Sequence, residues 1–152
     1  MNKKEKGFTL IEMLVVVAVI GLLASLILVG LSSFRTRGRD TRRVADTKEI
    51  QNGLELYYMK NGSYPVLTSG NWDDLEQELV NANIGITNLP QDPTAPTRSY
   101  DYGSDGQHYV IAVTIEDPDA NKSLLESDLD GSQYGGVNCG DASNDSVYCI
   151  GM

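Results

Sequence analysis

The chain of 152 residues is poor in the residues that build catalytic and metal centres, with one histidine and two cysteines. Two cysteines are too few for a disulfide-framework fold and cannot supply a four-ligand zinc site. The motifs HExxH, GxGxxG and GxSxG are absent, and the lone His108 is expected to lie in a strand. The sequence therefore predicts no enzyme, and its length fits one domain with an appended segment.

Basic residues are scarce in the larger part of the chain. Residues 49–152 carry three Lys/Arg and seventeen Asp/Glu, whereas residues 1–48 carry nine and four. The net charges are therefore -14 and +5. Because binding to phosphates needs Lys and Arg, the acidic part argues against direct nucleic-acid binding.

A long uncharged segment lies near the start. The 19 residues Met13–Leu31 contain no charge and no proline, which is long enough for a membrane-spanning helix. The apolar core of a secretory signal is usually shorter, about 7–15 residues, and ends at a small-x-small cleavage site. The segment is followed instead by five arginines, which favours an uncleaved anchor: Arg35, Arg37, Arg39, Arg42 and Arg43. Lysines precede it, so the positive-inside rule alone leaves the topology open.

One acidic residue stands at the edge of this segment. If the helix begins at Phe8, Glu12 lies one turn inside it. A carboxylate within lipid costs several kcal/mol unless it is paired or stays at the interface. Glu12 is thus either an interfacial residue or one that meets a cation inside the membrane.

The helix is expected to continue well beyond the apolar segment. Residues 32–60 lack proline, and Ile50, Leu54 and Tyr57 recur at helical spacing. Asn61-Gly62 and Pro65 then predict its end. The expected helix spans about residues 8–61, with an amphipathic second half whose arginines form a solvated or headgroup-facing collar.

The remaining residues predict a small antiparallel sheet. A short helix is expected after Asn71, which suits an N-cap. Three segments have strand character: Arg98–Tyr102, His108–Glu116 and Ser146–Ile150. The predicted fold class is α+β, with a long N-terminal helix packed against this sheet.

The start of the chain resembles the type IV pilin family, which includes the pseudopilins of type II secretion. The resemblance rests on the basic leader Lys3–Gly7, the segment Phe8–Glu12 and the apolar run, and it extends through Glu55–Pro65. It implies that a prepilin peptidase cleaves between Gly7 and Phe8 and then methylates the new amine of Phe8. The leader then stays in the cytoplasm and the acidic head lies outside. This topology takes precedence over the one suggested by counting basic residues on the two sides of the apolar segment.

The same resemblance implies a division of the chain and a function. Residues 1–7 are the leader, 8–31 the transmembrane and fibre-core half of the helix, 32–61 its amphipathic half, and 62–152 the head. Copies polymerise into a helical filament with the help of an inner-membrane assembly platform, and Glu12 pairs with the Phe8 amine of a neighbour to set the register. The subunit is a single-pass protein of the cytoplasmic membrane before assembly and part of a cell-surface pilus or periplasmic pseudopilus afterwards.

The acidic tail carries two further expectations. Cys139 and Cys149 resemble the disulfide that closes the C-terminal loop of many type IV pilins, which favours a pilin; the alternative is two unrelated thiols. Major pseudopilins bind calcium in their C-terminal loop, and Asp128 and Asp130 are the candidate ligands here, against a simple solvated acidic surface. No other cofactor is expected.

Three functions stay open at this point. The favoured one is a structural subunit of a type IV pilus-like filament. The alternatives are a major pseudopilin of type II secretion and a membrane-anchored binding domain that does not polymerise.

Overall fold

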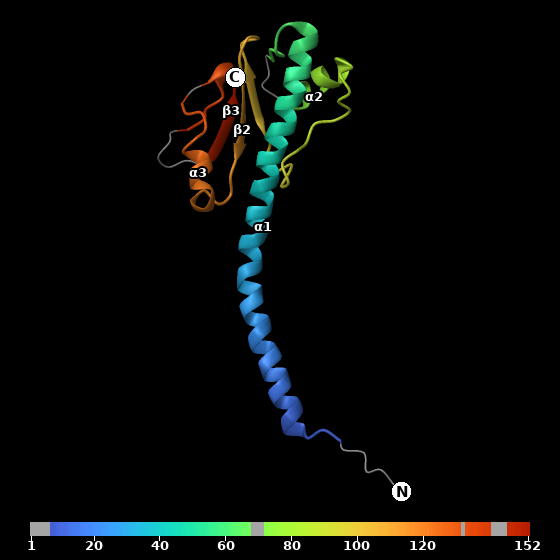
Figure 1. Ribbon diagram of the computed structural model, residues 1–152, viewed down its shortest axis with the longest axis vertical. Helices are drawn as coiled ribbons and strands as arrows, with labels where there is room; N and C mark the ends of the chain where they lie inside the picture. Colours follow the sequence, from blue (N-terminus) through green and yellow to red (C-terminus); the bar gives the residue numbers. More distant parts are fainter. Residues whose placement is uncertain (1–6, 68–71, 132, 141–145) are drawn as a thin grey trace. The chain divides into compact units, whose positions relative to one another are not determined.

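The computed structural model describes residues 7–67, 72–131, 133–140 and 146–152, without the side chains of residues 26 and 28–30. Leader residues 1–6 and the predicted cap Asn71 lie outside these ranges. The elements, labelled in Figure 1 where there is room, are α1 (Leu10–Asn61), α2 (Trp72–Asn81), β1 (Asp101–Ser104), β2 (Tyr109–Thr114), η1 (Asp119–Asn121), α3 (Lys122–Leu125), η2 (Tyr134–Gly136) and β3 (Val147–Gly151). This order confirms the predicted α+β class.

Helix α1 agrees closely with the helix expected over residues 8–61. It runs without interruption from Leu10 to Asn61. It ends where Gly62 adopts a positive φ of 76° and its amide donates to the Tyr58 carbonyl at 2.8 Å, a common glycine-terminated helix end. The chain divides into two compact units, Met1–Arg35 and Thr36–Met152. Within the described residues, no helix meets the length and hydropathy expected of a membrane span.

The sheet is antiparallel with strand order β1-β2-β3. The second and third strands lie close to their predicted positions, but the first was predicted too early, at Arg98–Tyr102. It begins at Asp101, because Tyr102 pairs with Ile111 across a hairpin. The carboxylate of Asp105 closes that turn by accepting hydrogen bonds from the amides of residues 107 and 108. The residue at which a strand begins depends on which residues pair across the sheet. Local alternation of apolar and polar residues does not reveal that register.

Strand β2 is buried on both faces. One face packs into the core shared with α1 and α2, whose members include Ile50, Leu54, Leu75, Leu79, Tyr109, Ile111 and Val113. The other face packs against the C-terminal loop through Val110, Ala112, Val137, Cys139 and Cys149. The sheet of the second unit is thus covered by helices on one side and by the disulfide loop on the other.

Candidate functional site

The predicted cleavage junction, Gly7–Phe8, is exposed. Gly7 and Phe8 precede α1 in a segment without regular secondary structure, and Phe8 is 80% exposed. A Cβ added to Gly7 would meet no atom within 4 Å. Neither packing nor a positive φ requires glycine there, so the reason for this residue type lies outside the folded chain.

Glu12 forms a reciprocal cap with Thr9 at the start of α1. Its carboxylate accepts hydrogen bonds from the Thr9 amide at 2.7 Å and the Thr9 hydroxyl at 2.8 Å. In return the Glu12 amide donates to the Thr9 hydroxyl at 3.3 Å. This is a capping box, and its T-x-x-E signal is present in the sequence from Thr9 to Glu12. Glu12 therefore has a local partner within its own chain.

The surface that follows Glu12 is apolar and exposed. No charged residue occurs from Met13 to Phe34. The exposed large side chains of this stretch include Leu14, Val17, Ile20, Leu22, Leu23, Ile27 and Phe34. A helix that is apolar on all sides needs lipid or other protein around it.

A buried ion cluster joins α1 to the head. Arg43 is fully buried, and its guanidinium contacts three carboxylates. Nε and Nη2 donate to both oxygens of Asp92 at 2.6 and 3.0 Å, while Nη1 lies 2.8 Å from Asp40 and 2.7 Å from Glu116. The bidentate pairing with Asp92 is the strongest geometry available to arginine. The cluster therefore connects α1, the loop before β1 and the end of β2 at one point.

Asp40 satisfies a second set of donors in the same cluster. Its carboxylate accepts the backbone amides of Glu116 and Asp117 at 2.9 and 3.0 Å and the Asn121 side-chain amide at 3.3 Å. These contacts orient the chain that leaves β2. Full pairing matters because a buried charge without partners is strongly destabilising.

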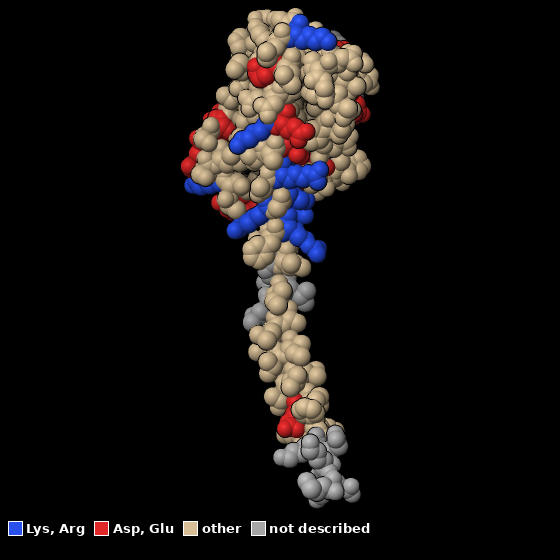
Figure 2. Space-filling view, turned by 45° about the vertical axis from the view of Figure 1, so that its right-hand side comes forward, with Lys and Arg blue, Asp and Glu red and all other residues tan. Residues whose placement is uncertain are grey.

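The prediction of a solvated arginine collar is wrong for Arg43. Arg39 is partly buried as well, and its guanidinium forms a two-point pair with the Glu116 carboxylate. Arg37 and Arg42 keep 59% and 63% of their side chains exposed, as the collar predicts. Figure 2 shows basic side chains gathered on one stretch and acidic ones spread more widely. Arg43 is buried where three carboxylates surround its guanidinium, whereas the exposed Arg37 and Arg42 each lie near one carboxylate, at 3.6 and 3.8 Å.

The cluster lowers the pKa of two acids. Burial raises the pKa of Asp92, but the hydrogen bonds from Arg43 and Thr94 outweigh burial and hold this pKa at about 2. The Arg39 hydrogen bond, aided by Arg43, likewise lowers the pKa of Glu116 to about 2. Both groups bind protons more readily in the unfolded chain, where carboxyl pKa values are about 4.

We expect stability to fall steeply in acid. Because both folded-state pKa values are depressed, the contribution of these groups is present above about pH 4 and is lost as the pH falls towards 2. The melting temperature of the detergent-solubilised full chain should therefore be level from about pH 7 to 5 and drop below pH 4. Glu116→Gln should flatten part of that drop. A melting temperature unchanged down to pH 2 would contradict the role of these pairs.

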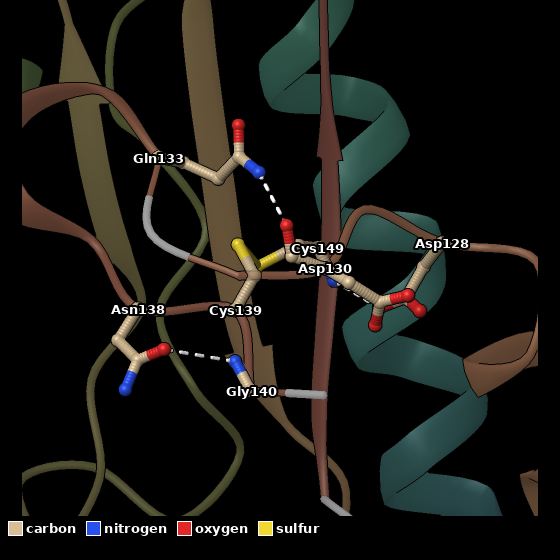
Figure 3. The surroundings of a disulfide bond; sticks show 7 residues. All are labelled: Asp128, Asp130, Gln133, Asn138, Cys139, Gly140 and Cys149. Atoms are coloured by element: carbon tan, nitrogen blue, oxygen red, sulfur yellow. Dashed lines mark hydrogen bonds between the residues drawn. A yellow bond between two sulfur atoms is a disulfide. The ribbon is translucent and has the colours of Figure 1, made fainter. Parts of the chain in front are cut away.

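The predicted disulfide between Cys139 and Cys149 is present, and both cysteines are fully buried. Figure 3 shows the bond, with Asn138 and Gly140 flanking Cys139 and linked by a hydrogen bond. On the other side of the bond, the Asp128 carboxylate accepts the Cys149 amide at 2.7 Å. The loop is thus fastened to β3 by a covalent bond and a charged hydrogen bond.

The two candidate calcium ligands have different surroundings. One carboxylate oxygen of Asp128 accepts a hydrogen bond from the Cys149 backbone amide. Asp130 is exposed, and its backbone carbonyl accepts a hydrogen bond from the Gln133 side-chain amide. Among the described residues, no group of three or more His, Cys, Asp or Glu is placed to hold a metal ion. Calcium binding stays a prediction.

Removing the disulfide should loosen the loop without unfolding the sheet. Closing a loop of this length contributes about 2–3 kcal/mol, so the double variant Cys139→Ala/Cys149→Ala should melt on the order of 10 °C lower. A reducing agent should produce a similar loss in the wild-type chain and none in the double variant. Equal melting temperatures for all forms would show that the bond adds nothing to stability.

The chain is similar to several known proteins. A family model described as the prokaryotic N-terminal methylation motif matches residues 2–28. The type II secretion system core protein G of Escherichia coli K12 is 30% identical over 122 residues, which cover 80% of this chain and 72% of that protein. The core protein G of Klebsiella pneumoniae is 30% identical over 77% of this chain and 87% of its own length, and that of Vibrio cholerae is 32% identical over 73% and 79%. No solved structure gives a significant match.

Proposed function

Since this chain belongs to the family of type IV pilins and type II secretion pseudopilins, we propose that it polymerises into a helical filament through its N-terminal helix. The family is structural, and the chain is not an enzyme. The observation that carries the proposal is the exposed, uncharged surface from Met13 to Phe34, directly preceded by Glu12 and an open Gly7–Phe8 junction.

Before assembly, lipid covers this surface. The 19 residues Met13–Leu31 extend about 29 Å as a helix, close to the roughly 30 Å of a bilayer core. The leader lies on the cytoplasmic side, where the prepilin peptidase acts, and the head lies outside. An assembly platform in the cytoplasmic membrane then transfers the subunit from lipid into the filament core.

Within the filament, the new amine of Phe8 meets Glu12 of a neighbour. Methylation keeps that amine cationic, and Glu12 is the acidic residue within the uncharged surroundings of the fibre core. Such a buried pair adds little net stability but penalises wrong registers, because a misplaced subunit leaves both charges unpaired.

Two kinds of filament are supported by different observations. The relatives named above are core components of type II secretion, which supports a periplasmic pseudopilus. The Cys139–Cys149 disulfide supports a type IV pilus, because many pilins close their C-terminal loop in this way. The two differ in where the assembled filament lies.

Mass spectrometry of the protein in its native cells tests the proposal. Filaments sheared from the cell surface should contain a chain that begins at methylated Phe8, which indicates a pilus. The same processed chain found only inside the cell envelope indicates a pseudopilus. A Gly7→Val variant should keep its leader and stay in the membrane. If the wild-type chain also keeps Met1–Gly7, the anchored binding domain becomes the better account.

A further inference from the structure

The exposed charges of the head unit, Thr36–Met152, differ in sign along the chain. Between residues 36 and 48 the exposed charged residues are all basic: Arg37, Arg42 and Lys48. From residue 49 onwards, the described residues expose eight acids and two lysines: Glu49, Asp73, Glu78, Asp101, Asp105, Asp119, Glu126, Asp130, Lys60 and Lys122. The first three residues therefore form a basic patch on an otherwise acidic surface, and Figure 2 shows basic side chains gathered on one stretch of the molecule.

Arg37 and Arg42 can each bind another carboxylate. Nε of Arg37 lies 3.6 Å from the Asp117 carboxylate, and Nε of Arg42 lies 3.8 Å from that of Asp46. Both distances exceed a hydrogen bond, and the two arginine side chains are 59% and 63% exposed. Arg43 differs, since its guanidinium is buried and contacts three carboxylates of its own copy. The exposed arginines thus keep donors that a carboxylate of another protein can reach.

Glu78 is an exposed acid at the opposite end of the head unit. It lies near the end of α2, and no ion pair joins its carboxylate to another described residue. The end of α2 lies beside the end of α1, because the Ala82 amide donates to the Glu78 carbonyl and the Ala82 carbonyl accepts from Lys60. The helix from Arg42 to Lys60 is about 27 Å long at about 1.5 Å per residue. Within one copy, Glu78 therefore lies far from Arg42.

Other charged groups near this end are engaged within their own copy. Lys60 donates to a backbone carbonyl, and Glu55 accepts from a tyrosine hydroxyl. Asp105 accepts two amides of its own turn, and its second oxygen contacts the His108 ring. Among the described acids at this end, Glu78 is the one whose carboxylate stays open to a partner.

We propose that the basic patch of one copy binds Glu78 of a second copy when the head units pack in the filament. This inference rests on the proposed function. Copies in a helical filament point the same way, so their contacts are heterologous and join one end of a head unit to a different surface of the next. Head units that expose eight acids repel one another, and pairing of Arg37 or Arg42 with Glu78 offsets this repulsion at one defined position.

Charge reversal in the full chain tests the contact. Arg42→Glu should lower the yield of assembled filaments about tenfold or more, because two acids would then meet between copies. Lys122→Glu is the matched control and should stay within about twofold of wild type. Both residues are exposed and lie 3.8 Å from an acid four positions further along a helix, so the two variants make the same local change. An intact disulfide and unchanged protease resistance of the membrane-bound chain confirm that each variant folds.

Two further experiments identify the partner residue. Glu78→Arg alone should also impair assembly, whereas Arg42→Glu combined with Glu78→Arg should return the yield to within about threefold of wild type. In cells that make both an Arg42→Cys copy and a Glu78→Cys copy, a disulfide-linked dimer should form that neither variant gives alone. The inference is overturned if Arg42→Glu assembles like wild type, if the double reversal does not restore assembly, or if no linked dimer forms. Absence of wild-type filaments would instead overturn the proposed function itself.

Discussion

Glu12→Ala is expected to abolish filament assembly while leaving cleavage between Gly7 and Phe8 intact. In the filament the variant would bury the Phe8 amine without an anionic partner, which costs several kcal/mol at every subunit. The junction itself is unchanged, because Gly7 and Phe8 lie outside α1 in exposed chain. The measurement is the amount of sheared or fractionated filament together with the N-terminal mass of the membrane-bound chain.

The structure requires a control for this experiment, because Glu12 also caps α1 through Thr9. Glu12→Gln keeps a side chain that can complete the capping box but removes the charge. If the charge sets the register, Gln and Ala variants fail alike. If Glu12→Gln assembles normally and Glu12→Ala does not, the residue acts as a helix cap and the pairing with the Phe8 amine is wrong.

Arg43→Met is expected to destabilise the head by about 3–5 kcal/mol, a large share of the 5–15 kcal/mol typical of folded proteins. The variant leaves Asp40, Asp92 and Glu116 close together without the guanidinium that joins them. Denaturant unfolding of the full chain, followed by the fluorescence of Trp72, measures the effect. We also expect a lower steady-state level of the protein in cells.

Arg42→Met is the matched control for that variant. Arg42 is the adjacent residue, is 63% exposed, and lies 3.8 Å from Asp46. An exposed pair of this kind contributes about 0–1 kcal/mol. Adding Asp92→Asn to Arg43→Met should recover part of the loss by removing an unpaired charge. Equal stabilities for the Arg42 and Arg43 variants would show that the cluster does not hold the head on the helix.

The sequence predicted only the apolar part of the buried stripe of α1. Spacing identified Ile50 and Leu54, and both are fully buried. The same spacing continues back through Thr47, Arg43 and Asp40, which are buried to a similar degree. The buried face of α1 therefore follows one helical spacing throughout. A search limited to apolar residues ends at Ile50, because the next buried residues towards the N-terminus are polar or charged.

Arg98 could not be distinguished from other surface cations by its sequence. Its neighbours predicted a strand, and the structure instead places it before β1, in the wall of a cavity that includes Trp72. The residues that line this cavity are brought together by folding across more than twenty positions. No local signal contains that information.

The sequence by itself determined the long helix, its end at Gly62 and the strand around Ile111. Those features follow from local rules: periodicity, backbone freedom and short motifs. Only the tertiary structure decided which charges are buried. Arg43 and Asp92 are separated by 49 positions, and the guanidinium can leave water only where such a distant carboxylate meets it. Burial of a charge is a property of the assembled surroundings, whereas the burial of Ile50 and Leu54 can be predicted from their helical spacing.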